Sequence, residues 1–531
     1  MATLPSLLLK LLAPPQQWQL LLVLLLPVVV SILLITSRSR RTSRRRIRTP
    51  PGPARLPVLG NLLQLGALPH SSLRDLARRH GPVMMLRLGA VTAVVVSSPE
   101  AAQEVLRTHD ADCCSRPPSP GPMRLSYGCR DVAFAPYDGY WREVRRVFVG
   151  ELFSARRVQA AWRARQDQVE KLIRKLTWPE PKPVELNDHI FTLVDGIVGA
   201  VAFGNIYGTG RFTDRKRFHH LLDDAMDVLA GFSAEDFFPN AAGRLVDRLT
   251  GLAARRERVF EQLDAFFEMV IEKHLDSCKT ESTPDGGGSN LVDALIGLWK
   301  QGKQYGDLRF TREHAKAIIF DTFVGGVGTS SVTILWAMAE LIRAPRVMRK
   351  AQAEIRAVVG ERDGDRVLPD DLPKLKYLKN VVKETLRLHP PVTLLLPRET
   401  MRHVKIGGFD VPAKTRVLVN AWAIGRDPAS WDEPEAFDPD RFETKRVEFN
   451  GTHFDFLPFG AGRRICPAVA MGAANVEFTL ANLLHCFEWA LPEGMAAEEV
   501  SMAEAGLLTV HKKTPLVLVP TRYTAIDVHL I

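Results

Sequence analysis

The sequence contains Phe459-Gly-Ala-Gly-Arg-Arg-Ile-Cys-Pro467, which places one cysteine behind a glycine-rich turn with two arginines just before it. Gly460 and Gly462 permit backbone angles and close approaches that a side chain would block. Pro467 suits the first position of a helix, so we expect Cys466 at the positive end of that helix. The helix end and the arginines should lower the pKa of the thiol and favour the thiolate, the form that binds metals. The stretch therefore predicts a cysteine that ligates an iron.

A haem iron held by a cysteine thiolate is directed toward cleavage of the O–O bond, so this turn indicates oxygen chemistry. For a cysteine in an arbitrary context, the ordinary alternative is a small buried hydrophobic residue. Here the surroundings favour the ligand, because the stretch resembles the haem-binding signature of the cytochrome P-450 superfamily, Phe-x-x-Gly-x-Arg-x-Cys-x-Gly. It matches at Phe459, Gly462, Arg464 and Cys466, and the last position is Ala468. The resemblance implies haem b with Cys466 as the axial iron ligand, in a mainly α fold with minor β structure.

The composition is that of a globular protein with an unusual first segment. At 531 residues, 46% hydrophobic and 24% charged, the chain can form a large core and is not disordered. Its net charge of +10 could indicate a nucleic-acid partner, but residues 1–48 hold Lys10 and seven arginines without any acid. The rest of the chain is nearly neutral, so we expect no nucleic-acid partner. Six cysteines without a CxxC pair favour a reducing compartment over a disulfide framework.

The first segment also contains an apolar run that, with its flanks, is just long enough to span a bilayer as a helix. The alternatives are a buried core helix and a cleaved signal peptide, but the basic cluster lies on the wrong side for a signal peptide. Because Lys and Arg prefer the cytosolic side, we expect a lumenal N-terminus at 1–19 and a transmembrane signal anchor at 20–36. A basic, proline-rich linker at 37–54 would join this single-pass anchor, in the endoplasmic reticulum membrane, to a cytosolic haem-thiolate monooxygenase domain at 55–531.

Hydrophobic periodicity and turn residues predict the elements of the body. Val83–Leu88 and Ala93–Val96 are typical of a strand pair, and the segment Glu100–Thr108 is expected to be a helix. From there to about residue 390 the pattern is mostly helical, and short strands are expected at Val404–Ile406 and Arg416–Val419. We find no internal repeat, so the body is predicted to be one mainly helical domain with minor sheet.

A predicted helix at Tyr377–Leu388 carries Glu384 and Arg387 on one face, since residues three apart are neighbours on a helix. Alone, this is an ordinary exposed ion pair worth roughly 0.2–0.5 kcal/mol. Together with Arg441 farther along the chain, it resembles the Glu-x-x-Arg helix of the superfamily and its later arginine. The resemblance implies a buried Glu384–Arg387–Arg441 network that braces the haem side of the fold and is costly to break at any member.

Trp141 and Arg145 share one face of another predicted helix, which taken alone could be an ordinary amphipathic helix. By resemblance, both contact a haem propionate, and Arg398 and Arg464 fit the same role. Three arginines for two carboxylates is physically reasonable, because a guanidinium pairs with a carboxylate through two parallel hydrogen bonds.

A second glycine-rich segment lies inside a predicted helix at Ala317–Arg343. Gly325, Gly326 and Gly328 cost up to ~1 kcal/mol each in a helix interior, so we expect a local distortion there. The superfamily pattern Ala/Gly-Gly-x-Asp/Glu-Thr matches at Gly325, Gly326 and Thr329, with Gly328 at the position of the acid. In the family, the acid and the threonine help deliver protons to bound dioxygen, which implies catalytic positions at Gly326, Gly328 and Thr329. Without the acid, water or the substrate would take over part of that delivery.

The resemblance covers nearly the whole chain and is closest to the plant microsomal branch that includes the 71 family. Four stretches resemble its aldoxime-converting members: Asp112–Pro117, Ala234–Arg244, Asn420–Pro428 and His511–Leu516. The resemblance implies a monooxygenase that uses O2 and NADPH electrons, with a separate NADPH-cytochrome reductase as partner, because the chain has no flavin or dinucleotide motif. The substrate would be a small aromatic or lipophilic plant metabolite, with 4-hydroxyphenylacetaldoxime converted to a hydroxynitrile as the specific expectation.

Other functions remain open from the sequence. One is an oxygen-independent haem-thiolate dehydratase or lyase, which Gly328 favours, and another is a hydroxylase of a terpenoid, indole or phenylpropanoid. A haem protein without turnover, serving as a membrane scaffold, is disfavoured by the intact Cys466 turn and by Thr329. Substrate contacts are expected from Leu125–Ala135, Phe237–Phe238, Gly326–Thr329, Val392–Leu395 and Leu507–Leu508.

Overall fold

The structure, a computed structural model, describes residues 48–153, 155–204, 215–230, 233–280, 290–302, 304–305, 308–360 and 366–523. The predicted segments 1–19 and 20–36, and the predicted linker up to residue 47, lie outside the described residues. The proline-rich end of that linker packs on the body. There the Met85 N–H donates to the Pro51 carbonyl at 2.7 Å, and the Asp410 N–H donates to the Arg48 carbonyl at 2.7 Å.

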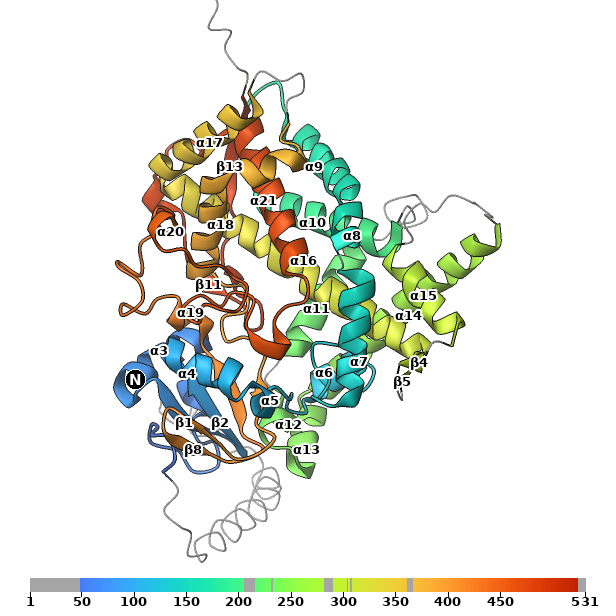
Figure 1. Cartoon of the computed structure of the whole chain (residues 1–531), viewed down its shortest axis with the longest axis vertical. Coiled ribbons are helices and arrows are strands. Elements are labelled where there is room, and N and C mark those ends of the chain that lie inside the picture. The colour runs from blue at the N-terminus through green and yellow to red at the C-terminus, as the bar shows by residue number, and fades with distance from the viewer. Residues whose placement is uncertain are drawn as a thin grey trace, which may run out of the picture.

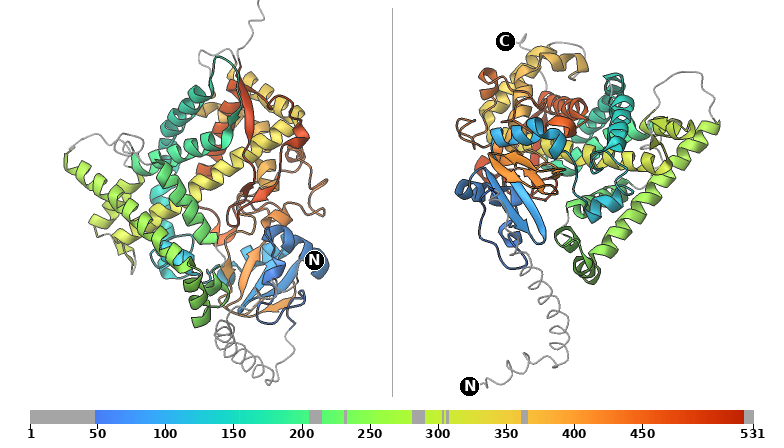
Figure 2. Two further views of the ribbon diagram at one scale, coloured as in Figure 1. Left: turned by 180° about the vertical axis from the view of Figure 1, so that it is seen from behind. Right: turned by 60° about the horizontal axis from the view of Figure 1, so that its bottom comes forward.

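Long helices form most of the molecule and pack around one central helix, α16 (Arg312–Arg343), as Figures 1 and 2 show. Most residues of α16 are buried, against α10 (Leu186–Phe203), α18 (Lys376–Leu388) and α21 (Val469–Cys486) among others. By length and apolar composition α10 and α16 could span a membrane, but their burial within the fold explains that composition. The predicted mainly helical class is confirmed.

The remaining helices surround this core. They are α3 (Pro69–His80), α4 (Pro99–Gln103), α5 (Asp110–Cys113), α6 (Pro120–Leu125), α7 (Gly139–Val147), α8 (Ala155–Ala160), α9 (Trp162–Leu176), α11 (Arg215–Ala230), α12 (Ala234–Phe237), α13 (Ala241–Leu249), α14 (Leu252–Thr280), α15 (Leu291–Lys300), α17 (Pro345–Val359), α19 (Ala421–Ile424) and α20 (Arg441–Thr444).

Sheet is the minor component, and its largest part lies beside the helical body near the described N-terminal end (Figure 1). This sheet has the order β1-β2-β9-β6, with β2 and β9 parallel and the other neighbours antiparallel. Its strands are β1 (Val83–Leu88), β2 (Val91–Val96), β9 (Arg416–Val419) and β6 (Arg398–Glu399). A smaller sheet contains β3 (Val184–Glu185), β13 (Val517–Arg522) and β10 (Phe487–Ala490). Two-stranded sheets pair β4 (Gln304–Tyr305) with β5 (Leu308–Arg309), β7 (Val404–Ile406) with β8 (Phe409–Val411), and β11 (Glu504–Ala505) with β12 (His511–Lys512).

The predicted elements agree closely with these bounds, and the differences lie at element ends. β2 begins two residues before the predicted start, because Val91 pairs with Leu88 across a tight turn in which Gly89 has φ 59°. The predicted helix at 100–108 is α4 followed by a π-helical turn, Glu104–Thr108. α16 begins at Arg312, five residues before the prediction, because Thr311 and His314 form a capping box there.

Candidate active site

Backbone contacts hold the cysteine turn. The Cys466 N–H donates to the Phe459 carbonyl at 3.0 Å, which closes the turn. Gly460 and Gly462 have φ of 70° and 69°, a region that other residues rarely adopt, so the predicted requirement for glycine angles is confirmed. A Cβ at Gly462 would lie only 2.2 Å from the Leu106 carbonyl oxygen. The turn is therefore fixed by its own backbone and by close packing on the segment before α5.

The helix after the turn begins later than predicted. α21 starts at Val469, with Ala468 as the N-cap residue, so Pro467 lies outside the helix. Cys466 is three residues before the first helical residue, and the positive end of the helix lies farther from the thiol than expected. The backbone N–H of Ala468 still hydrogen-bonds to the cysteine.

The predicted decrease in the pKa of Cys466 is wrong for the polypeptide itself. Burial raises the pKa of the thiol, and the Ala468 N–H and the positive charge of Arg145 lower it by less than burial raises it. A metal ion that coordinates a cysteine deprotonates it outright. A thiolate at this site would therefore depend on a coordinated metal ion, because the surrounding residues assist only in part.

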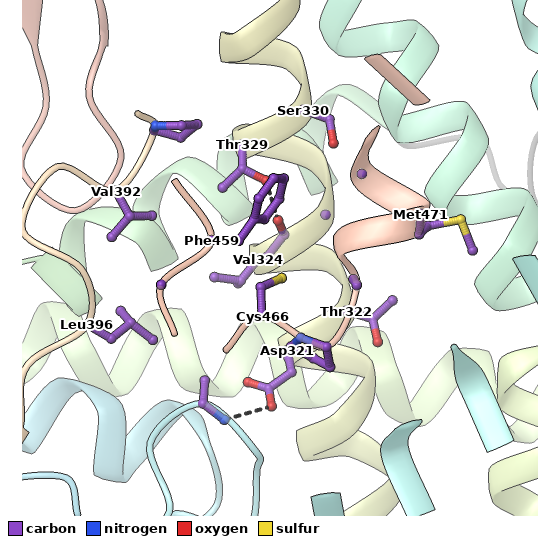
Figure 3. Close-up of a pocket in the computed structure, with 18 of the residues that line it drawn as sticks. Asp321, Thr322, Val324, Thr329, Ser330, Val392, Leu396, Phe459, Cys466 and Met471 are labelled. Carbon is purple, nitrogen blue, oxygen red and sulfur yellow. Dashed lines mark hydrogen bonds between the residues drawn. The ribbon is translucent and has the colours of Figure 1, made fainter. Parts of the chain in front are cut away.

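A cavity of about 330 Å³ lies between the cysteine turn and α16. Cys466 and Phe459 line it from the turn, while Val324 and Thr329 line it from α16 (Figure 3). The rest of the wall is largely apolar. Six of the residues predicted to contact substrate outside α16 also line it: Val132, Ala133, Phe134, Val392, Leu395 and Leu508. Phe237 and Phe238 do not, because they pack beside the β1–β2 turn, where the Ala90 N–H donates to the Phe237 carbonyl at 2.7 Å.

Arginines bring positive charge to this cavity. Arg398 lines it and donates from Nη1 to Asp110 Oδ1 at 2.7 Å and from Nη2 to the Ala461 carbonyl at 2.8 Å. Arg145 also lines it and donates from Nη2 to the Ile465 carbonyl at 2.7 Å, on the cysteine turn. Both side chains therefore tie the turn to elements distant in sequence.

Arg464 and Trp141 support each other at the same wall. The Arg464 guanidinium donates to the carbonyls of Cys114, Val132 and Ala135 at 2.8, 3.1 and 2.6 Å, and it lies 4.1 Å from the centroid of the Trp141 ring. The Trp141 indole N–H donates to the Val132 carbonyl at 3.0 Å. Trp141 is buried behind the arginine and is not part of the cavity wall, although the resemblance places it on a propionate.

Arg116 is a cavity residue that the sequence analysis missed. Its Nε donates to the Ala133 carbonyl at 2.8 Å, and its Nη1 donates to the carbonyls of Leu396 and Pro397 at 2.7 and 2.8 Å. Burial lowers its pKa well below the usual value. The available signal for Arg116 was its place in Asp112–Pro117, a stretch that already resembles the aldoxime-converting members.

These residues fit a haem. Burial lowers the pKa of Arg464 to about 10 and also lowers that of Arg145, because their partners are mostly neutral carbonyls. Two carboxylates from a cofactor would compensate buried guanidinium groups of this kind. With a cysteine at the cavity and apolar walls around it, the donor set matches a group that has a thiolate-bound iron, an apolar ring and two acidic arms.

The Glu384, Arg387 and Arg441 side chains meet as a network beside this site. Arg387 donates from Nε and Nη2 to the two oxygens of Glu384, both at 2.7 Å, and Arg441 Nε donates to Glu384 Oε1 at 3.0 Å. The Glu384 and Arg387 side chains are 0% exposed. Arg387 also donates to the carbonyls of Gly425, Pro434 and Ala436, so it joins α18 to the segment before α20.

The glycines of α16 do not distort the helix, contrary to the prediction. The helix is continuous through all three, and the Thr329 hydroxyl donates to the Gly325 carbonyl at 2.5 Å. A Cβ at Gly326 would lie 3.2 Å from Val198 of α10, so close packing explains this glycine. A Cβ at Gly328 would meet nothing within 4 Å. The missing acid at 328 is therefore not forced by lack of space.

A mainly helical fold in which a cysteine turn and arginines face a central helix across a cavity defines a haem-thiolate protein. The sequence model of the Cytochrome P450 family matches residues 50–518. The chain therefore belongs to the cytochrome P450 family.

Two of its relatives have names that mention oximes. The chain is 62% identical to 4-hydroxyphenylacetaldehyde oxime monooxygenase of Sorghum bicolor over 478 residues, which cover 90% of this chain and 89% of that protein. It is 45% identical to 2-methylbutanal oxime monooxygenase of Manihot esculenta over 481 residues, which cover 90% and 92%. Among solved structures, a zebra fish cytochrome P450 with progesterone has a TM-score of 0.70 at 25% identity, covering 86% of this chain and 98% of that chain.

The protein is a plant 71-type cytochrome P450 monooxygenase that carries a haem iron on a cysteine thiolate. It receives electrons from a separate redox partner and acts on a small molecule.

Proposed function

We propose that the protein converts an aldoxime to a hydroxynitrile, with 4-hydroxyphenylacetaldoxime as its substrate. The observation that carries this proposal is the 62% identity to the sorghum oxime monooxygenase across about nine-tenths of both chains. The Manihot relative acts on an oxime too, by its name. The largely apolar cavity wall supports a small aromatic substrate.

In this account Cys466 ligates the iron, and the turn around Phe459 and Gly462 presents it. Arg145, Arg398 and Arg464 hold the propionates. Trp141 packs behind two of these guanidinium groups, with its ring centroid 5.5 Å from Arg145 and 4.1 Å from Arg464. When bound, the haem supplies reversible electron transfer and a site for dioxygen at its iron, chemistry that no side chain offers.

The chain itself contributes little acid–base chemistry along the glycine segment of α16. The Thr329 hydroxyl donates to its own helix, which leaves its lone pairs to accept a hydrogen bond from a ligand in the cavity. Gly328 contributes no carboxylate. This composition favours a substrate that brings its own exchangeable proton, and the N–OH group of an aldoxime does so.

We also propose the membrane organisation predicted from the sequence. A lumenal segment 1–19 and an anchor at 20–36 would precede the linker at 37–54 and the monooxygenase domain at 55–531. An apolar run followed by seven arginines supports this, as does similarity to plant 71-type relatives, one of them 46% identical over 478 residues. The partner would be NADPH-cytochrome reductase in the endoplasmic reticulum membrane.

An oxygen-independent dehydratase is the second candidate, favoured by the glycine at position 328 in place of an acid. It would form the nitrile and stop, whereas the monooxygenase would continue to the hydroxynitrile. A hydroxylase of another specialised metabolite is compatible with the same cavity.

The test is turnover by the full chain in microsomes with a plant reductase, NADPH and air. The preparation is offered 4-hydroxyphenylacetaldoxime beside a terpenoid, an indole and a phenylpropanoid, and consumption of each is measured. We expect the oxime alone to be consumed. Preferential consumption of another compound would reject the aldoxime assignment while leaving the monooxygenase intact.

A further inference from the structure

Within the part of the chain that the structure describes, one carboxylate lines the cavity, Asp321 of α16. Its side chain lies at the lower part of the cavity in Figure 3, on the same helix as Thr329. Asp321 Oδ2 accepts the N–H of Val132 at 2.7 Å and that of Ala133 at 3.2 Å. The group is therefore held in place by the loop between α6 and α7, with its carboxylate at the cavity.

A second carboxyl, Asp131, stands behind the first. It is fully buried, and its Oδ2 accepts the Phe134 N–H at 3.1 Å. Its charge also interacts with that of Asp321, and two carboxyls so close cannot both ionise freely. Burial raises the pKa of both groups, that of Asp131 further. Asp131 is fully buried with one backbone N–H on its carboxyl, whereas Asp321 accepts two, so Asp131 holds the proton and Asp321 carries the charge. The cavity wall thus presents one fixed negative charge.

Three threonine hydroxyls on α16 donate to their own helix and remain able to accept a neutral hydrogen bond. Thr322, Thr329 and Thr333 each donate to the carbonyl four residues earlier in the helix, at 2.8, 2.5 and 2.8 Å. A ligand that carries a hydrogen-bond donor therefore finds its strongest acceptor on this helix at Asp321, because a bond to a charged group is worth about twice a neutral one.

We propose that Asp321 binds the phenolic hydroxyl of the substrate, at the end remote from the oxime. The proposal rests on the function proposed above and names the residue that selects a hydroxylated ring. Asp321, Gly325 and Thr329 follow at intervals of four and share one helix face, with a rise of about 6 Å between successive members. Gly325 faces open space, since a Cβ there would meet nothing within 4 Å. An aromatic ring can therefore lie along this face between Asp321 and Thr329.

The charges around the cavity favour a neutral hydroxyl over an ammonium group. Four arginines line the wall, and Arg145, Arg398 and Arg464 are assigned to the propionates, which leaves the positive charge of Arg116 beside the single carboxylate of Asp321. Arg116 acts directly on this carboxylate, whose pKa it lowers against the effect of burial. A cation would meet this positive field, whereas a phenol donates a hydrogen bond without adding positive charge.

The test measures ligand binding to the haem-loaded full chain. The change in haem absorption reports the binding, and turnover is not measured. The ligands are 4-hydroxyphenylacetaldoxime, phenylacetaldoxime and 4-methoxyphenylacetaldoxime, with 4-ethylphenol and ethylbenzene as a pair without an oxime. We expect each hydroxylated ligand to bind roughly tenfold to hundredfold more tightly than its unsubstituted counterpart, the range for a hydrogen bond to a charged group. The methoxy compound keeps the ring oxygen but carries a methyl group in place of the proton, so it donates nothing and should show no such gain.

Asp321→Asn should reduce this preference to less than about threefold, because it removes the charge and keeps the shape. Asp247→Asn is the matched control, since Asp247 is also a buried carboxylate that accepts a backbone N–H, from Ala234 at 2.7 Å, but lies outside the cavity wall. It should keep the full preference. If Asp321→Asn fails to load haem, the ligand series on the unaltered chain decides.

The outcomes separate the two proposals. Equal binding of the three oximes, or a preference that survives in Asp321→Asn, overturns the role of Asp321 and leaves the aldoxime function standing. Discrimination within the ethylphenol pair without any binding of oximes supports Asp321 and overturns the aldoxime function.

Discussion

Replacing Glu384 by glutamine should destabilise the folded chain by about 3–5 kcal/mol, the usual cost of breaking a buried charge pair from one side. The carboxylate accepts two hydrogen bonds from Arg387 at 2.7 Å, one from Arg441 at 3.0 Å and one from the Asp438 N–H at 2.8 Å. Glutamine keeps the shape but removes the charge and one of the two acceptor oxygens. The Arg387 charge would then remain buried, with only backbone carbonyls and one amide oxygen around it.

The expected loss of folding stability in Glu384→Gln is large enough to measure by thermal unfolding. The family region, residues 50–518, should unfold with an entropy of roughly 1 kcal/mol per degree, from about 2.1 cal/mol/K per residue. A loss of 3–5 kcal/mol therefore lowers the midpoint of thermal unfolding by about 3–5 °C. Circular dichroism of the haem-loaded chain measures the midpoint, and the carbon monoxide spectrum measures the fraction with a thiolate ligand.

A surface pair with the same spacing serves as the control. Asp75 and Arg78 are three residues apart on α3, with 3.5 Å between Oδ1 and Nη1, and their side chains are 55% and 63% exposed. Asp75→Asn should cost less than about 0.5 kcal/mol. A Glu384→Gln midpoint no lower than that of Asp75→Asn would refute the argument. Adding Arg387→Met should recover part of the loss, because it removes the unpaired buried charge.

Three further changes have defined outcomes. Gly462→Ala should cost at least about 2 kcal/mol and sharply reduce haem loading measured by absorbance, because the residue has φ 69° and its Cβ would lie 2.2 Å from the Leu106 carbonyl oxygen. Gly328→Asp should leave the unfolding midpoint unchanged, since a Cβ there meets nothing within 4 Å. It should also raise the amount of product formed per NADPH consumed. A lowered unfolding midpoint would contradict the open space at this position. The Asp321 pKa rises from 3.8 to about 6 on folding, so the folded chain binds more protons in that interval. Stability should therefore fall by up to roughly 3 kcal/mol as pH rises from 4 to 6, and urea midpoints of Asp321→Asn should show a smaller fall, which comes from the buried Asp131.

The sequence predicts best what local patterns determine. The bounds of α18 follow from its apolar spacing and from the prolines after His389, and β7 and β9 coincide with their predicted ranges. The cysteine turn could also be predicted from the sequence, because the turn itself requires the backbone angles that Gly460 and Gly462 adopt.

Features that depend on partners distant in the chain could not be predicted this way. The Asp131–Asp321 pair joins residues 190 positions apart, and neither acid has a local motif. The pKa of Cys466 was mispredicted because nearby charges are visible in sequence, whereas burial depends on the whole fold. The glycines of α16 predicted a distortion, but packing such as that of Gly326 on Val198 keeps the helix continuous.

The central claim is that a haem-thiolate monooxygenase acts on an aldoxime here, and its most direct test is product analysis in air and under nitrogen. The reduced full chain with its reductase and NADPH is given 4-hydroxyphenylacetaldoxime in both conditions. The account predicts the nitrile under nitrogen and the hydroxynitrile, or its aldehyde breakdown product, in air. No conversion in either condition, by a preparation whose reduced form shows the thiolate-type carbon monoxide spectrum, would contradict it.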